Sequence, residues 1–588
     1  MENVKVYCEN TQAYEPVAMG TTLQDLCQKI GCKDVLAALV DNKLKSLDYK
    51  VINPHNVRFV GYEHPDGRRT YIRSLCFVLQ KVVREMFPEK VLVIDYSLPS
   101  GLYCEIRELS PLEDGRPNVY AVNDSEIEAV GTAMRSLIAA DLPFTKTMMS
   151  LEDCCELFDR QHQSEKVHLL RTRGKFNYNV YQLDGCMDTF HGPLIPSTGL
   201  LKTFDLTAFN EGFCLQYPME GDTDKVLPMK RQSKLATALK EHSDWCSIMG
   251  VRGVGALNKA VLSGKIVDLI NLSEALHERK YAEIANQIYA RRGSVKIVFI
   301  AGPSSSGKTS TSKRLALQCR ILGLNPRVIE LDNYFVEREL TPRDENGEYD
   351  FEALGAMDLD LLGRQLNDLL EGKSVEIPRF DFKEGRKHFE GNFMQLHDKD
   401  ILIMEGIHAL NPAMIPGVDP SKVFRVYASA LTSLSIDENN NISTSDNRML
   451  RRMVRDNRTR GVVPESTITR WQSVRRGENR NIFPFQENAD AVFNSAHIFE
   501  LPVLKYYAEP LLRRISPTSP AYTEASRMLK FLGYIVALSP AEIATGDLSR
   551  TILRAVKLSG GTGSSKNIGL NCSNSLAIFI PVGTLNLP

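Results

Sequence analysis

Apolar positions recur with two different periods along this chain. From residue 296 onward, short apolar runs alternate with stretches in which apolar residues recur every three or four positions. This alternation is typical of parallel strands joined by crossover helices. Residues 1–62 alternate short apolar runs with turns, which predicts a small α+β unit. Residues 70–86 carry a helical pattern that stops before Pro88, and residues 230–292 form a largely helical connector.

One interruption of the apolar pattern indicates a specific chemistry. After the strand-like residues 297–300, the segment GPSSSGKT at residues 302–309 satisfies G-x-x-x-x-G-K-[S/T], and a helical pattern follows it as far as Gly323. The glycines let the backbone N–H groups point inward, and the helix N-terminus adds partial positive charge, so we expect the loop to hold a polyphosphate. A glycine-rich turn that binds nothing is the alternative, which the flanking strand and helix disfavour. The predicted ATP-binding residues are Gly302, Pro303, Ser304, Ser305, Ser306, Gly307, Lys308, Thr309 and Ser310.

Within this loop, Lys308 is expected to reach the β- and γ-phosphates, and the Thr309 hydroxyl to bind Mg²⁺. Two carboxylates follow apolar strands further along: Asp332 comes after residues 327–331, and Glu405 after 401–404. In open α/β sheets ligands bind beyond the carboxyl ends of the strands, so one carboxylate could accept a proton while the other helps to hold Mg²⁺. Either could instead be a helix cap or a strand-end carboxylate, although two beside one phosphate loop make that reading less favourable.

A run of arginines occupies residues 446–460. Its cationic members recur at three- and four-residue steps, while apolar residues occupy another face of the same predicted helix. Such a helix could close over ATP and neutralise charge on the transferring phosphoryl group. A solvated basic face and a nucleic-acid patch remain open as alternatives. The spaced arginines are Arg448, Arg451, Arg452, Arg455 and Arg458.

Composition narrows the class of protein. The 588 residues suggest three or four domains, and 43% hydrophobic with 24% charged residues is ordinary globular usage. A formal net charge of −1 gives no global field for nucleic acid. Twelve cysteines without a CxxC pair fit reduced thiols in a cytosolic protein. Neither a signal-like N-terminus nor a membrane-length apolar run is present, so we expect a cytoplasmic protein that does not enter membranes.

With these motifs in order, residues 296–512 resemble the uridine kinase and phosphoribulokinase family. The matching segments are GPSSSGKT, LDNYF around Asp332, DFEALGAMD around Glu352, IPRFDF at 377–382, IMEGI around Glu405 and RRMVRDNRTRG. The resemblance implies ATP- and Mg²⁺-dependent phosphorylation of a nucleoside 5′-hydroxyl. It also implies roles for single residues. Those implied for catalysis are Asp332 as general base with Lys308, Arg455 and the lid arginine Arg460; those for substrate are Glu352 at the ribose, Phe380, Phe382 and Arg452; those for the metal are Thr309 and Glu405.

Two positions depart from the family pattern. Members that choose uridine or cytidine carry an aromatic residue and a histidine that hydrogen-bond the base, whereas this chain has Phe380 at the first position and Gly385 near the second. A phenylalanine ring and a glycine supply no hydrogen bond of that kind, so selection through unpaired polar groups is weakened. The identity of the base is therefore left open.

The front half resembles two modules of another family. Residues 1–62 are similar to the ubiquitin-like TGS module, and residues from 63 to about 210 to the second additional domain of threonyl-tRNA synthetase. That domain carries an HxxxH pair and a Cys and His near a GP turn, a set that could hold zinc or a tRNA 3′ end. The four positions are here Arg73, Phe77, Phe190 and Leu194. We therefore predict neither a metal nor editing chemistry there.

Together these observations predict a P-loop NTPase-type α/β domain with a parallel sheet flanked by helices, preceded by two α+β domains. The predicted units span residues 1–62 (TGS-like), 63–215 (synthetase-like), 216–292 (helical connector), 293–548 (kinase-like) and 549–588 (a Gly/Ser/Asn-rich flexible tail). The predicted activity is that of a nucleoside kinase acting on a small molecule as a homo-oligomer. The alternatives are a kinase of a non-nucleoside sugar or alcohol, and a nucleotide-switched regulatory protein that binds RNA through its N-terminal domains.

Overall fold

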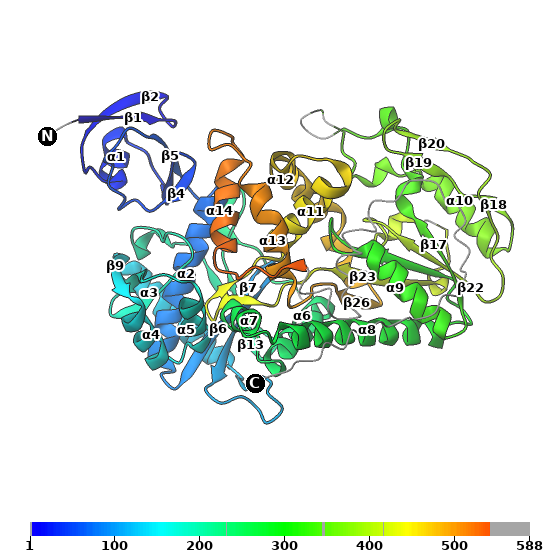
Figure 1. Ribbon diagram of the computed structural model, residues 1–588, viewed down its shortest axis with the longest axis horizontal. Helices are drawn as coiled ribbons and strands as arrows, with labels where there is room; N and C mark the ends of the chain where they lie inside the picture. Colours follow the sequence, from blue (N-terminus) through cyan, green and yellow to red (C-terminus); the bar gives the residue numbers. More distant parts are fainter. Residues whose placement is uncertain (1–2, 231, 344–346, 348, 416, 541–588) are drawn as a thin grey trace, which may run out of the picture.

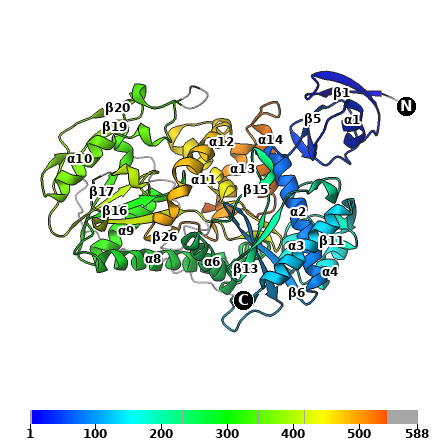
Figure 2. The ribbon, with the colours of Figure 1, turned by 180° about the vertical axis from the view of Figure 1, so that it is seen from behind.

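The computed structural model describes residues 3–230, 232–343, 347, 349–415 and 417–540. The predicted flexible tail at 549–588 lies outside these residues. Figures 1 and 2 show an elongated molecule in which the N-terminal modules stand at one end and the phosphate-loop sheet at the other. Within the described ranges, no helix has both the length and the apolar character needed to cross a membrane.

The first unit is a small mixed sheet closed by one helix. The strands lie in the order β2-β1-β5-β3-β4, and the helix α1 begins at a capping box in which Thr22 and Asp25 each bond the other's backbone N–H. Alternate residues of β1, such as Val6 and Cys8, point into a core that Leu26 of α1 completes. The bounds are β1 Asn3–Cys8, β2 Ala13–Ala18, α1 Leu23–Ile30, β3 Ala37–Val40, β4 Lys43–Lys45 and β5 Asn56–Val60.

The second unit packs a long helix and a shorter one against antiparallel sheets. Its central helix α2, Pro65–Met86, begins five residues earlier than the apolar pattern predicted, because His64 caps it and Pro65 occupies its first turn. The sheets run β12-β13-β7-β6, with β8 beside β7, and β11-β10-β9. The bounds are β6 Lys90–Leu98, β7 Gly101–Glu108, β8 Val119–Tyr120, α3 Asp124–Ala139, β9 Thr145–Ser150, α4 Leu151–Arg160, α5 Ser164–Thr172, β10 Asn177–Leu183, β11 Cys186–Asp188, β12 Asp205–Phe209, β13 Gly212–Gln216, β14 Pro218–Met219 and β15 Asp222–Val226.

The second half is built on a five-stranded parallel sheet in the order β17-β22-β16-β23-β26. This confirms the predicted α/β fold. The central strand β16 is buried on both faces: Val298 and Ile300 pack towards α8 and α9, whereas Ile297 and Phe299 pack towards α6 and α10. The bounds are β16 Ile297–Ala301, α9 Lys308–Ile321, β17 Asn325–Glu330, α10 Leu359–Leu370, β22 Asp400–Glu405, β23 Val423–Ser429 and β26 Ala491–Asn494; four short strands flank the sheet, β18 Val375–Glu376, β19 Arg379–Asp381, β20 Arg386–His388 and β21 Phe393–Met394.

A helical layer joins the two halves. The predicted connector forms three helices, α6 Ser233–Ile248, α7 Val254–Leu262 and α8 Ile266–Ala290. One hydrophobic core runs from Leu169 of α5 through Leu257 of α7 to Met449 and Met528, far later in the chain. In Figure 1 the orange helices α13 and α14 accordingly lie between the blue N-terminal part and the green sheet. The remaining bounds are β24 Ser435–Asp437, β25 Asn440–Asn441, α11 Thr444–Arg460, α12 Pro464–Asn481, α13 Glu500–Leu512 and α14 Tyr522–Leu532.

Candidate active site

The phosphate loop connects β16 to α9 in a conformation that its glycines require. A Cβ atom on Gly302 would lie 1.9 Å from the carbonyl oxygen of Ala428, so no side chain fits there. Gly307 has a φ of 86°, in the left-handed region that favours glycine. Ser305 adopts a similar conformation with a φ of 58°, at a cost of about 1 kcal/mol or more. A loop that holds such backbone angles is preorganised for a ligand.

The polar groups of this loop fit a polyphosphate. The hydroxyls of Ser305 and Ser306 are buried and have no hydrogen-bond partner among the described residues. The Lys308 ammonium folds back over the loop and donates to the carbonyl oxygens of Gly302 (3.0 Å) and Pro303 (3.2 Å). It forms no ion pair with a carboxylate in the described ranges. Unpartnered donors and an uncompensated cation at a helix N-terminus are what phosphate oxygens would satisfy.

Thr309 and Glu405 lie together at the same edge. The Thr309 hydroxyl donates to Glu405 Oε1, and Glu405 is the last, buried residue of β22. A hydroxyl and a carboxylate at hydrogen-bonding distance can both reach one small cation, and Mg²⁺ prefers such oxygen ligands. The described residues contain no group of three or more His, Cys, Asp or Glu side chains that could hold a metal. This pair therefore fits an ion that takes its other ligands from phosphate oxygens and water.

Asp332 sits in a short 3₁₀ turn, Leu331–Tyr334, directly after β17. Its carboxylate is reached by solvent, but protein atoms surround it, and this partial desolvation together with the negative charge of Glu405 raises its pKa to about 6. The positive charge of Lys308 acts in the opposite direction. The predicted base thus lies within electrostatic reach of both the loop lysine and the second carboxylate.

Glu352 approaches the same place from the loop before α10. Burial, with the charge of Glu478, raises its pKa to about 7, while Arg452 and Lys308 lower it. The close approach requires Gly477 of α12, where a Cβ atom would lie 2.6 Å from Cβ of Glu352. Asn481 on the same helix donates to the Glu352 carbonyl oxygen at 2.6 Å. Helix α12 thereby fixes the position of this carboxylate.

A buried ion pair holds the phosphate loop against α11 and α12. Arg448 and Glu478 are 1% and 0% exposed, and the guanidinium donates to both carboxylate oxygens at 2.5 and 2.7 Å. Glu478 Oε1 also accepts from the backbone N–H of Ser304 at 3.0 Å, and Arg448 donates to the Ser304 carbonyl oxygen at 3.1 Å. The pair therefore holds Ser304 of the loop through both its backbone N–H group and its carbonyl oxygen.

The other arginines of α11 are divided between the loop and the helix itself. Arg451 donates to the carbonyl oxygen of Ser495 at 2.7 Å and also pairs with Glu500. Arg452 donates to the Ser304 hydroxyl at 2.9 Å. Asp456 of the same helix pairs with Arg455 at 2.7 Å and with Arg460 at 3.7 Å, and Arg458 stacks on the ring of Tyr507. Since three of the arginines contact the loop or its supports, the run is not simply a solvated basic face.

The predicted acceptor residues form an aromatic group. The rings of Phe335, Phe380 and Phe382 lie 5.2 to 6.2 Å apart, and Phe382 is exposed. Gly385 has a φ of 74°, and a Cβ atom there would lie 2.8 Å from Cβ of Arg338. A histidine at this position would be strained and would displace Arg338. Gly385, which differs from the family pattern, therefore fits a local backbone that does not accommodate larger residues.

The four synthetase-like positions come together around α2. None of them carries the histidine or cysteine of the family pattern. The rings of Phe77 and Phe190 lie 5.1 Å apart, and both Phe77 and Leu194 are buried. Arg73 donates to the carbonyl oxygen of Pro193 at 2.6 Å. His191, beside them, lies 3.3 Å from the side chain of Asn440. Packed rings therefore occupy the place where metal ligands or a substrate would need polar groups.

Sequence reasoning missed Glu478 as a part of this site. It lies 169 positions after the end of the phosphate loop, on a helix whose pattern shows nothing unusual. Arg448 was noted only as one member of the arginine run. No local signal marks either residue, because each acquires its role only through contact with the other and with Ser304.

Comparison with known proteins yields two separate similarities. A model described as the phosphoribulokinase / uridine kinase family matches residues 297–500. The uridine kinase of Macrococcus caseolyticus is 30% identical over 197 residues, which cover 33% of this chain and 86% of that enzyme. The N-terminal region is similar to threonine–tRNA ligases: that of Desulforamulus reducens is 25% identical over 193 residues, 32% of this chain. This chain spans only 29% of the length of that ligase.

Solved structures also align with part of this chain. A structure of a possible uridine kinase from Bacillus stearothermophilus shares 20% sequence identity with a TM-score of 0.23, covering 34% of this chain and 89% of that one. A D-glycerate 3-kinase from Cryptococcus neoformans shares 13% identity with a TM-score of 0.20, covering 43% of this chain and 87% of that one.

Proposed function

We propose a function from one premise: this chain belongs to the phosphoribulokinase / uridine kinase family. It is accordingly a P-loop kinase, a phosphotransferase. The finer proposal is an ATP-dependent kinase that transfers the γ-phosphoryl group to the 5′-hydroxyl of a nucleoside. The observation that carries it is the convergence of Asp332, Lys308 and Glu405 at one edge of the sheet, beside a loop with unpartnered hydroxyls.

In the proposed reaction, ATP lies on the loop amides with Lys308 at its terminal phosphates. Asp332 accepts the proton of the acceptor hydroxyl, whose oxygen attacks the γ-phosphorus as the bond to the β–γ bridging oxygen breaks; ADP leaves and Asp332 later returns its proton to solvent. The chain contributes mainly position and charge, since the transferring group carries dispersed negative charge. Mg²⁺, which Thr309 and Glu405 would hold, supplies further neutralisation of the phosphates.

The remaining predicted residues have consistent positions in this proposal. In this proposal Glu352 would accept hydrogen bonds from the ribose hydroxyls, and the neighbouring rings of Phe380 and Phe382 would pack against a base. Arg452 contacts Ser304, so it can respond to both loop and substrate. Arg455 and Arg460 share Asp456 as a common partner, from which they could turn towards a phosphate.

A second candidate acceptor is a non-nucleoside sugar or alcohol. One specific observation favours it: the aromatic group and Gly385 supply no side-chain hydrogen bond to a base. A site that makes no side-chain hydrogen bond to the base discriminates weakly between different bases. It also discriminates weakly between acceptors that carry a base and acceptors that do not.

The test is ATP consumption with Mg²⁺ against a panel of nucleosides and simple sugars, with Lys308→Ala as the blank. Nucleoside-dependent turnover that the variant lacks supports the proposal, and turnover with sugars alone moves it to the second acceptor class. Tight ATP binding without turnover on any acceptor would contradict the kinase proposal and favour a nucleotide-switched regulatory protein.

A further inference from the structure

Five cations from four parts of the chain meet where the N-terminal units contact α14. They are Lys45 of β4, Arg73 of α2, Arg173 and Lys175 after α5, and Lys530 of α14, and we call them the interdomain cation cluster. The other four each act electrostatically on Lys530. Helix α14 packs against β4, and the two lie side by side in Figure 1.

Aromatic and backbone groups, rather than acids, surround these cations. The Arg173 guanidinium lies 3.7 Å above the ring of Tyr534, and Arg73 donates to the Pro193 carbonyl oxygen. Arg73 is only 9% exposed, yet its Nε has no hydrogen-bond partner among the described residues. His191, which faces Arg73 and Lys530, is kept neutral because burial and these two positive charges hold its pKa well below the usual value.

Several carboxylates that act electrostatically on residues of this region are already engaged elsewhere. Asp66 pairs with Arg69 at 2.8 Å, Asp48 with Lys146 at 2.9 Å, and Asp437 with Lys166. Within the described ranges, none of the five cations forms an ion pair with a carboxylate. The positive charge of the cluster is therefore not balanced by the protein.

This imbalance has an energetic consequence. Desolvation, followed by the charges of Arg73 and Arg173, lowers the pKa of Lys530 to about 8, although the side chain is reached by solvent. Burial lowers the pKa of Arg73 to about 10. Like charges held together oppose each other's ionisation, and a bound anion would relieve that repulsion.

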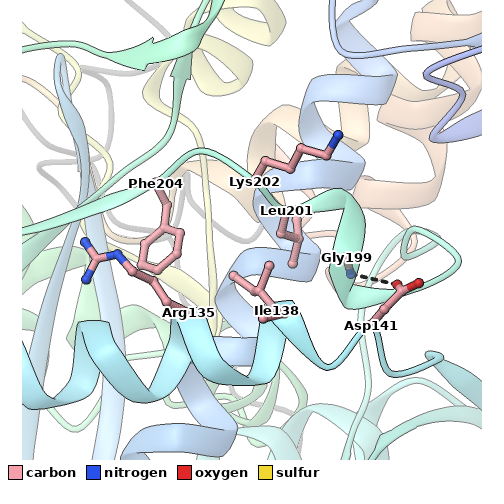
Figure 3. Close-up of a pocket in the computed structure, with 8 residues that line it drawn as sticks. Arg135, Ile138, Asp141, Gly199, Leu201, Lys202 and Phe204 are labelled. Carbon is pink, nitrogen blue, oxygen red and sulfur yellow. Dashed lines mark hydrogen bonds between the residues drawn. The ribbon is translucent and has the colours of Figure 1, made fainter.

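One cation elsewhere in the N-terminal half, Arg135, has a carboxylate partner. A surface cavity of about 440 Å³ lies between α3 and residues 199–204, as Figure 3 shows. There Arg135 stacks on Phe204 and pairs with Asp205 at 3.5 Å. Asp141 accepts from the backbone N–H of Gly199 at 3.0 Å. Arg135 thus has the carboxylate partner that the members of the cluster lack among the described residues.

We propose that the interdomain cation cluster binds a small molecule that carries a di- or triphosphate group. Two guanidinium groups and several ammonium groups match the dense charge and many acceptor oxygens of such a group. The ligand is small because the cluster comprises five cations on a chain whose net charge is −1, whereas nucleic acid requires an extended basic surface. This site is separate from the phosphate loop, and it includes a helix that follows the kinase sheet.

The test is titration calorimetry with tripolyphosphate on the full chain. Two sites are expected, one at the phosphate loop and one at the cluster. Lys308→Ala should remove or weaken the first, Lys530→Glu should weaken the second by about tenfold or more, and both changes together should remove both. Lys45→Glu, on a different element, repeats the test if Lys530→Glu alters folding, and Lys530→Arg should keep the binding.

The matched control is Lys225→Glu, which reverses the charge of an exposed lysine on β15 and should leave both sites intact. Two binding events of unchanged affinity in both the Lys530→Glu and Lys45→Glu chains would overturn the proposal. A single-stranded RNA that displaces tripolyphosphate, binds more tightly and shows a steep salt dependence would overturn the assignment to a small molecule.

Discussion

The phosphate loop and the four synthetase-like positions around α2 are two regions of one chain where the resemblances seen in the sequence imply a ligand site. In the loop, every polar type of the motif is present, the hydroxyls of Ser305 and Ser306 lack partners, and Lys308 has no carboxylate partner in the described ranges. Around α2, the rings of Phe77 and Phe190 pack against each other. The first region leaves donors and a cation without partners in the protein, whereas in the second region packed rings occupy two of the four positions.

Similarity of fold and similarity of a binding site must therefore be judged separately. The backbone around α2 still brings the four positions together, but Phe77, Phe190 and Leu194 pack there as part of an apolar core that stabilises the fold. In the loop, backbone strain at Ser305 and unsatisfied donors lower stability unless a ligand occupies the site.

The largest effect is expected for Asp332→Asn. An amide cannot accept the acceptor proton, so turnover should fall by about 10²- to 10⁴-fold. ATP binding should change little, because Asp332 has no hydrogen bond to the loop. Steady-state kinetics and ATP calorimetry measure the two quantities, with Asp360→Asn on the exposed start of α10 as the matched control. Turnover within a few-fold of the original would remove Asp332 from the role of base.

The pH dependence of kcat/KM should report the ionisation of the same carboxylate, Asp332. Because the pKa of Asp332 is raised to about 6, the carboxylate is ionised above that pH and protonated below it. With one required base, kcat/KM for the acceptor should fall about tenfold for each pH unit below 6. A profile that stays flat down to pH 5, measured on a chain shown to remain folded, would contradict this assignment.

Glu478→Gln should have a smaller effect on turnover and a large one on stability. The change leaves Arg448 buried without its counter-charge, which costs about 3–5 kcal/mol. It also weakens the brace on Ser304, so ATP affinity should fall by about tenfold, the scale of a lost charged hydrogen bond. Thermal unfolding and ATP calorimetry are the measurements.

The control for that change is Glu283→Gln, which removes an exposed ion pair with Arg279 and should shift stability by less than about 1 kcal/mol. A double variant, Arg448→Met with Glu478→Leu, separates the two roles of the pair. It should recover much of the stability but not the ATP affinity. Recovery of both would show that the pair acts only on the fold.

Phe77→Ala should leave turnover unchanged. It opens a cavity in a buried aromatic group and should lower stability by about 3–5 kcal/mol. Turnover is measured below the new unfolding temperature, and Phe176→Ala, at an exposed ring, is the matched control. A loss of kcat without a loss of stability would mean that this region serves the reaction, and the contrast with the phosphate loop would fail.

Three strands of the parallel sheet, β16, β17 and β22, were predictable to within one or two residues at each end, whereas β23 and β26 were not predicted individually. The strands β16 and β22 are buried along their whole length, so they appear in the sequence as continuous apolar runs, as at residues 401–404 within β22. The phosphate loop was predictable because its function requires particular residues at fixed spacing. The early start of α2 was missed, although His64 and Pro65 carry a recognisable N-terminal signal.

Contacts between distant segments were not predictable from one sequence. The pairing of Arg448 with Glu478 depends on how α11 and α12 meet over Ser304, and no local pattern records that geometry. The interdomain cation cluster is similar, since its members come from positions between 45 and 530. The roles given to single active-site residues remain predictions until the variants are measured.

The core that joins α5, α7, α11 and α14 has a consequence for the order of synthesis. Its members extend from Leu169 to Leu538, so its first residues leave the ribosome hundreds of positions before the last. Contacts so distant in sequence form slowly, and partly made apolar surfaces are exposed meanwhile. Helix α11 cannot complete its packing before Met528 and Leu538 emerge. The nascent chain therefore contains the phosphate loop long before it can hold that loop in place.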